Sequence, residues 1–192
     1  MLRWLVLGLA ITGLTGCASV PPPVVVTGLN QARQERFELD GRIAVHYRND
    51  SSTAMIHWQH KPEIDQLVLS SPLGQTLSAL TRDKHGVSLV DSAQKTHHAE
   101  NVESLTEQLL GWKLPLENLS YWIVGNAVPG QSYQVQQDAA HGLVQLTQSG
   151  WVVTYSRWQQ VGGMNLPNKL TLVGQGVEVR LVIGEWKIVG LE

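Results

Sequence analysis

Apolar and polar residues alternate along much of this chain, and this period of two constrains the fold more than any other feature of the sequence. From Phe37 to Arg48 every second residue faces one side, which is typical of a strand with one buried face. We predict a strand there, a turn over 49–52, and further strands over 54–58, 66–69, 76–81, 86–90 and 95–99. The close spacing of these segments is typical of an antiparallel meander.

The pattern changes after residue 100. Asn101 can cap a helix, Leu105 and Leu109 fall four apart on one face, and Gly111 stands where a helix commonly ends. A second short helix is predicted over 116–125. The alternation then returns, and we predict strands over 133–137, 143–148, 151–157, 169–173 and 177–183.

Strands, a pair of helices and strands again predict an α+β fold. Too few helices separate the strands for a parallel sheet, so we expect a strongly curved antiparallel sheet, an unclosed β-barrel, with the helices over its open side. Such an arrangement encloses an apolar space. From the pattern alone, that space is either a filled core or a binding cavity.

The N-terminus reads as a signal peptide over 1–16, with one basic residue, Arg3, before an apolar run. Leu14 to Cys17 resembles the bacterial lipobox, so we expect Cys17 to be lipidated and to become the mature N-terminus. Ala18 follows, where an aspartate would resemble an inner-membrane retention signal, and this points to an outer-membrane anchor facing the periplasm. A proline-rich tether completes 17–28, and one domain is expected over 29–192.

Composition and motifs exclude several classes of function. Without Arg3, 13 of the 14 basic residues remain against 16 acidic residues, a net charge near −3 with no basic stripe for nucleic acid. Cys17 is the only cysteine, so no intramolecular disulfide can form. No nucleophile elbow, phosphate-binding loop, dinucleotide fingerprint or zinc-protease motif occurs, so neither an enzyme nor a cofactor is expected.

The seven histidines do not predict a metal site. His57 and His60 are three apart on a strand and should face opposite sides, and the adjacent His97 and His98 should do the same. We expect surface histidines and no metal.

The stretch SSPLGQT, residues 70–76, predicts a tight turn, because Pro72 suits its first corner and Gly74 tolerates positive φ. Leu73 at its tip either packs on a neighbouring element or faces something apolar outside the protein. We expect it to be exposed and to contact the membrane.

Six tryptophans lie in the mature domain, which has one phenylalanine. Tryptophan combines a large apolar body with one donor, which suits the wall of a lipid-binding hollow as well as an ordinary core. The residues expected to line an acyl-chain cavity share the apolar faces of the strands and helices; they are Ile43, Val45, Ile56, Trp58, Leu69, Leu105, Leu109, Leu119, Trp122, Ile123 and Trp151.

Five segments in order, FELDGRIAV, AMIHWQ, LVLSSPLGQT, LLGWKLPLENLSYWIVGNAVPG and LPNKLTLVGQGVEVRLVI, resemble the LolB family of outer-membrane lipoprotein receptors. The resemblance implies an unclosed β-barrel with a helical lid and a hydrophobic cavity. It also implies transfer of lipoproteins from the periplasmic carrier LolA to the inner leaflet of the outer membrane, with the cargo acyl chains and outer-membrane phospholipid as further partners. A monomer is expected. A basic face toward an acidic carrier is also implied, with Arg36, Arg42, Arg48 and Arg157 as candidates.

Two other functions remain open. An assembly or scaffold lipoprotein would have the same fold with a filled interior and a protein partner. A lipid-cleaving enzyme is the third alternative, although the sequence offers no recognisable nucleophile and base pair.

Overall fold

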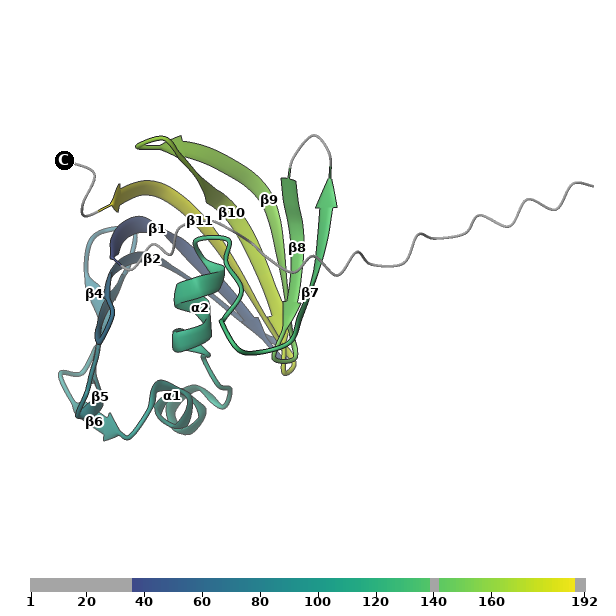
Figure 1. Cartoon of the computed structure of the whole chain (residues 1–192). Helices are drawn as coiled ribbons and strands as arrows, with labels where there is room; N and C mark the ends of the chain where they lie inside the picture. The colour runs from purple at the N-terminus through teal and green to yellow at the C-terminus, as the bar shows by residue number, and fades with distance from the viewer. Residues whose placement is uncertain (1–35, 139–141, 189–192) are drawn as a thin grey trace, which may run out of the picture.

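The computed structural model describes residues 36–138 and 142–188, and within them the chain forms eleven strands and two helices (Figure 1). The strands are β1 (Phe37–Tyr47), β2 (Asp50–Lys61), β3 (Ile64–Ser70), β4 (Thr76–Asp83), β5 (Gly86–Asp91), β6 (Thr96–Ala99), β7 (Tyr133–Asp138), β8 (Gly142–Gln148), β9 (Trp151–Val161), β10 (Met164–Gly174) and β11 (Val177–Ile188). The helices are α1 (Val102–Leu110) and α2 (Leu116–Trp122). Cys17, Ala18 and the proline-rich tether lie outside the described residues.

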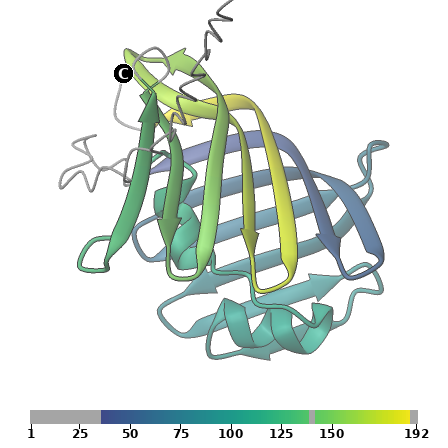
Figure 2. The ribbon, with the colours of Figure 1, turned by 90° about the vertical axis from the view of Figure 1, so that its right-hand side faces the viewer.

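All eleven strands form one antiparallel sheet, in the order β6-β5-β4-β3-β2-β1-β11-β10-β9-β8-β7. The pairing of β1 with β11 joins a meander before the helices to a meander after them. Because β6 and β7 stand at opposite ends of this order, the barrel is unclosed. The sheet curves strongly, and both helices lie on its concave side (Figures 1 and 2). The predicted antiparallel, unclosed sheet with two helices is therefore confirmed.

A bulge between Asp40 and Gly41 shifts the register of β1 against β11. A Cβ atom at Gly41 would lie 2.4 Å from the carbonyl oxygen of Val182, so only glycine lets the two strands approach this closely. Bulges and strand glycines bend a sheet, which accounts for part of the curvature.

The first helix begins and ends as predicted. The side chain of Asn101 accepts a hydrogen bond from the Ser104 N–H at 2.8 Å, and Gly111 ends the helix with φ of 79°. The second is shorter than predicted, because regular helix stops at Trp122 and a turn follows to Gly125, whose φ is 83°.

Several strand boundaries were wrong: β2 and β10 begin earlier than predicted, and β2, β9 and β11 end later, at Lys61, Val161 and Ile188. β2 already begins at Asp50, because the β1–β2 turn needs only two residues, with Arg48 at φ of 55°. β10 begins at Met164, not 169, because a bulge around Pro167 and Lys169 lets the strand continue through the proline.

The concave face holds one apolar cluster formed by the sheet and both helices. Inward positions of β1, β2 and β11 are apolar at nearly every second residue, and Leu105 of α1 and Leu119 and Trp122 of α2 close over them. The largest buried side chains include Trp58, Trp122 and Trp151. The predicted hydrophobic faces therefore meet in a single interior.

Candidate functional site

The β3–β4 turn presents an apolar side chain to solvent. Leu73 is 97% exposed. The backbone beneath it is fixed by hydrogen bonds from Gly74 N to Ser71 O at 2.9 Å and from Ser71 N to Gln75 O at 2.8 Å, with Gly74 at φ of 83°. The Ser71 hydroxyl also accepts from Gln75 N at 3.2 Å. The predicted turn and the exposure of Leu73 are confirmed, and hydrogen bonds within the turn fix the backbone that carries this side chain.

The β1–β2 turn lies at the same end of the sheet as Leu73, because successive hairpins of an antiparallel meander alternate between its two ends. The end of α1 reaches this end too. The Tyr47 hydroxyl donates to the carbonyl of Gly111 at 2.8 Å, and the Arg48 guanidinium lies 4.9 Å from the centre of the Tyr47 ring. Leu110, the last residue of α1, is exposed there.

The eleven residues predicted to line an acyl-chain cavity all belong to the concave-face cluster or pack directly against it. Seven of them are buried: Ile56, Trp58, Leu105, Leu119, Trp122, Ile123 and Trp151. Four are partly exposed: Ile43, Val45, Leu69 and Leu109. Since Ile43 and Val45 precede the β1–β2 turn and Leu69 precedes the Leu73 turn, the incompletely covered part of the interior lies at the Leu73 end. These four residues are called the open strip below.

Helix α2 is hydrogen-bonded to the wall formed by β8 and β9. Gln148, 2% exposed, accepts at its Oε1 from the indole Nε1 of Trp122 at 2.9 Å and from Val128 N at 2.8 Å, and its Nε2 donates to Val128 O at 3.0 Å. The Tyr155 hydroxyl donates to the Trp122 carbonyl at 2.7 Å, and burial raises the pKa of that hydroxyl. The sequence contains one signal for the buried role of Gln148: it is a polar residue at an inward-facing strand position, two residues after Leu146.

A buried ion cluster closes the other end of the concave face. Asp65 is completely buried, and its Oδ1 accepts from Trp58 Nε1 at 2.9 Å and from His60 Nδ1 at 2.7 Å. Its Oδ2 accepts from Arg82 Nε at 2.7 Å and pairs with the second guanidinium nitrogen at 2.5 Å. Burial alone would raise the pKa of Asp65, but the hydrogen bonds from His60 and Trp58 and the charge of Arg82 lower it below its usual value.

A polar pocket of about 250 Å³ lies beside this cluster, between the sheet and α2. Its lining residues are His60, Pro62, Arg82, Glu117, Ser120 and Tyr121. The Ser120 hydroxyl donates to the carbonyl of Glu117 at 2.7 Å, an ordinary bond within a helix turn.

The histidines were interpreted only partly correctly. His57 lies on the convex face and His60 on the concave face, as their spacing predicted. The expectation that the histidines are surface residues was wrong for His60 and His97, whose side chains are only 11% and 17% exposed, because each is paired with an aspartate. His97 Nε2 lies 2.9 Å from Asp91 Oδ2.

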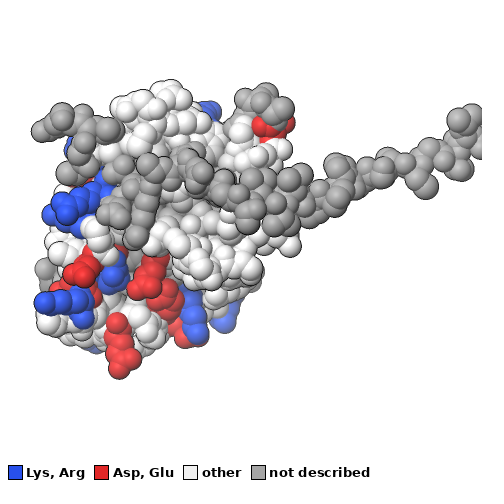
Figure 3. Space-filling model, viewed as in Figure 1, with Lys and Arg blue, Asp and Glu red and all other residues white. Residues whose placement is uncertain are grey.

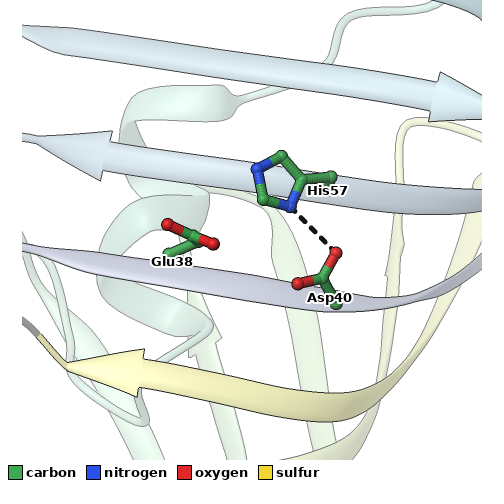
Figure 4. Close-up of side chains that lie close together, drawn as sticks. All are labelled: Glu38, Asp40 and His57. Carbon is green, nitrogen blue, oxygen red and sulfur yellow. Dashed lines mark hydrogen bonds and ion pairs between the residues drawn. The ribbon is translucent and has the colours of Figure 1, made fainter.

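Three metal-type side chains meet on the convex face of β1 and β2: Glu38, Asp40 and His57, whose ligand atoms lie within 4.8 Å of one another (Figure 4). Each already has a protein partner. His57 Nδ1 lies 2.8 Å from Asp40 Oδ1, and Lys187 Nζ donates to Glu38 Oε1 at 2.8 Å. These contacts tie β2, β1 and β11 together, and a lysine ammonium already neutralises the carboxylate that a cation would need.

Two of the four predicted basic candidates, Arg42 and Arg157, lie with Lys169 in a row across the convex face, and Arg36 and Arg48 are not part of it. Arg42 of β1 is opposite Val182 of β11, Val182 is opposite Lys169 of β10, and Lys169 is opposite Arg157 of β9. All four side chains are exposed. Strand register, which the sequence does not reveal, brings Arg42, Lys169 and Arg157 together, and they are called the basic row below.

On the face seen in Figure 3, acidic and basic side chains are intermixed over the half that carries β4–β6 and α1. The basic row contains cations only, although Asp40 lies two residues from Arg42 on the same face of β1. Among the described residues, neither helix is long and apolar enough to span a membrane.

A single open antiparallel sheet that curves around two helices and an apolar interior places this chain in the class of unclosed β-barrels. A solved domain from Vibrio parahaemolyticus, described as an outer membrane lipoprotein-sorting protein, shares the fold with a TM-score of 0.53 at 11% identity, covering 83% of this chain and 88% of that one. A DUF1329 family protein from Desulfovibrio piger shares it with a TM-score of 0.52 at 7% identity, covering 82% and 88%.

Residues 35–186 match the family described as outer membrane lipoprotein LolB, and the chain belongs to that family. The outer-membrane lipoprotein LolB of Nitrosomonas europaea is 36% identical over 193 residues, covering 95% of this chain and 91% of the relative. Those of Thiobacillus denitrificans and Pseudomonas paraeruginosa are 34% and 30% identical, each covering 97% of this chain and 98% and 96% of the relative.

Proposed function

We propose that this chain is an outer-membrane receptor in lipoprotein localisation. In this proposal it accepts lipoproteins from the periplasmic carrier LolA, holds their acyl chains against the concave face beneath α1 and α2, and inserts them into the inner leaflet of the outer membrane. Cys17 carries the lipid anchor, and the tether after it holds the domain at the periplasmic side. The family membership and the fold support this role.

The observation that carries the proposal is that the open strip and the exposed Leu73 occur at the same end of the sheet. Transfer of an acyl chain of roughly 16 carbons from water to an apolar environment is favourable by about 12 kcal/mol. The chain must therefore pass directly from one apolar surface to the next. An apolar contact with the bilayer beside the opening of an apolar interior allows that passage.

The cargo site is proposed to be formed by the eleven residues of the concave-face cluster predicted above. Because seven of them are buried, an acyl chain enters along the open strip and displaces side chains of α1 that pack there through apolar contacts alone, such as Leu109. The helices then act as a lid. Since the chain has no nucleotide-binding motif, transfer runs downhill in affinity from carrier to receptor to membrane.

Leu73 is proposed to enter the bilayer during release. Burying one leucine is worth about 1.5 to 3 kcal/mol, a tenfold to hundredfold preference. This is too weak to anchor a protein and suits a contact made and broken at each delivery. The basic row is the proposed docking surface for an acidic carrier, because three cations in register attract one sign of charge.

The test is mass spectrometry of the full chain with Cys17→Ala, purified from the periplasm without detergent. Co-purified lipoprotein or lipid supports the receptor, and uptake of a synthetic tripalmitoyl-cysteinyl peptide in a stoichiometric complex supports it independently. A chain that carries no lipid and takes up no lipopeptide is the scaffold lipoprotein with a filled core.

A further inference from the structure

The aromatic side chains at the end of the concave face opposite Leu73 pack against one another. Phe37 contacts Trp58 edge to face, with ring centres 5.1 Å apart, and contacts Trp186 in the same way at 5.5 Å. The His60 ring stacks on Phe37 at 4.9 Å. Trp58 pairs with Leu39 and Leu67 across the sheet, just before the β2–β3 turn, so these rings lie at the end of the interior that is farthest from the open strip.

Hydrogen bonds hold these rings in place. Trp58 Nε1 donates to the fully buried Asp65, which Arg82 and His60 hold from its other sides, and Trp186 Nε1 donates to the Pro167 carbonyl at 3.0 Å. Displacing Trp58 would leave a donor and a buried carboxylate short of a partner. Leucines of α1 that face the interior pack there through apolar contacts, and such contacts can be exchanged for contacts with an acyl chain at little cost.

Polar surface lies beyond the aromatic rings. The 250 Å³ pocket beside His60 and Arg82 is lined mostly by polar groups, including Glu117. A methylene group that passed the rings would leave an apolar environment and enter this pocket. Transfer free energy therefore favours a chain that ends at Trp58.

The length of the interior matches that limit. Val45, in the open strip, and Leu39, which pairs with Trp58, are six residues apart on β1, and a strand rises about 3.3 Å per residue, so about 20 Å separates the two levels. An extended chain of about 16 carbons is also about 20 Å long, since bonds of about 1.5 Å project about 1.25 Å along the chain.

We propose that Trp58, fixed by Asp65, is the closed end of the acyl-chain site and sets the longest acyl chain that the receptor holds. This rests on the proposed function, because it gives the depth and direction of the same cargo site. The carboxyl end of each acyl chain then lies near Val45 and Tyr47, close to Leu73, and the methyl end lies against Trp58.

The first test measures binding of cysteinyl lipopeptides with acyl chains of 10 to 20 carbons to the full chain with Cys17→Ala. Affinity should rise about fourfold per added CH₂ up to about 16 carbons and change less than twofold per CH₂ beyond that length. A rise that continues at the same slope to 20 carbons overturns the proposal. Absence of binding at every length refutes the proposed function itself.

Trp58→Leu removes part of the closed end while His60 and Arg82 still hold Asp65, and it should move the limit to longer chains by two or more carbons. Trp151→Leu is the matched control, since Trp151 is equally buried but lies at the Leu73 end of β9. It should lower affinity at all lengths without moving the limit. An equal shift in both variants overturns the proposal.

Photo-crosslinking of the otherwise unaltered chain tests the direction even if Trp58→Leu does not fold. A diazirine at the methyl end of the acyl chain should label the segment 37–42, which contains Leu39, or Trp58, and one near the carboxyl end should label the segment 43–48, which contains Val45 and Tyr47. The reverse pattern, or the same pattern from both probes, contradicts the assignment of Trp58 as the closed end.

Discussion

Trp122 and Gln148 are 26 residues apart in the chain, and the indole N–H of the first donates to the side-chain carbonyl of the second at 2.9 Å inside the protein. The same glutamine holds both backbone groups of Val128. One polar side chain at the end of β8 therefore fixes α2 and the segment that follows it against the wall of the sheet.

Replacing this glutamine should loosen α2. Gln148→Leu leaves the Trp122 indole and the Val128 N–H and C=O unpaired in the interior, and we expect a loss of about 3 kcal/mol in the free energy of unfolding. Gln136→Leu, at an exposed position of β7, is the control and should change it by less than about 0.5 kcal/mol. Urea unfolding measures both, and equal losses would show that the hydrogen bonds of Gln148 contribute nothing specific.

Asp65 should make stability fall in acid. Its pKa in the folded protein is below the ordinary value of 3.8, so its stabilisation is complete above that pH and is lost as the pH falls through the folded value. Asp65→Asn should be less stable than the parent by about 3 kcal/mol at pH 7, and the difference should narrow below pH 4. Thermal melts from pH 7 to 3 measure this, with the exposed Asp50→Asn as control. A difference that does not change with pH would contradict the assignment.

Cys17 should determine where the protein is found. Cys17→Ala behind a plain secretory signal should give a periplasmic protein that still takes up lipopeptide, because the proposed cargo site is in the folded domain. Fractionation and a lipopeptide-binding assay measure the two properties separately. A variant that remains in the outer-membrane fraction would place the anchor elsewhere.

The basic row should affect transfer of cargo from the carrier and should not affect direct binding of lipopeptide. Reversing two charges in Arg42→Glu/Lys169→Glu should slow transfer from the carrier on the order of tenfold at low salt and weaken its salt dependence, because electrostatic attraction acts on encounter. Direct lipopeptide binding should stay within twofold of the parent. Lys61→Glu/Lys84→Glu, which reverses two exposed charges outside the row, is the matched control. Equal slowing by the control would mean that net charge matters and the position of the row does not.

The alternating pattern predicted most strands, the cap at Asn101 and the exposure of Leu73, because each depends on residues close together in the chain. The cluster around Asp65 was not predicted, since His60, Trp58 and Arg82 meet it only through the pairing of β2, β3 and β4. Two polar residues at inward strand positions, Asp65 before Leu67 and Gln148 after Leu146, were nevertheless visible in the sequence as breaks in the pattern. These breaks mark the two buried polar centres of the fold, although neither centre was predicted from them.

The central claim is that acceptance of cargo and its release into the membrane use different parts of the molecule, and Leu73→Glu tests it most directly. The substitution places a charge where hydrocarbon is expected, whereas the open strip is unchanged. Since Leu73 is 97% exposed, the melting temperature should stay within about 2 °C of the parent. Leu73→Ala, which removes apolar area without adding charge, should give an intermediate effect.

The decisive measurement follows one labelled lipoprotein through two steps, from the carrier to the receptor and from the receptor into liposomes. The account predicts that Leu73→Glu binds cargo as the parent does and fails to deliver it, so that the cargo remains on the receptor. Equal loss of both steps, or a melting temperature lower by several degrees, would mean that Leu73 supports the fold and would contradict the account.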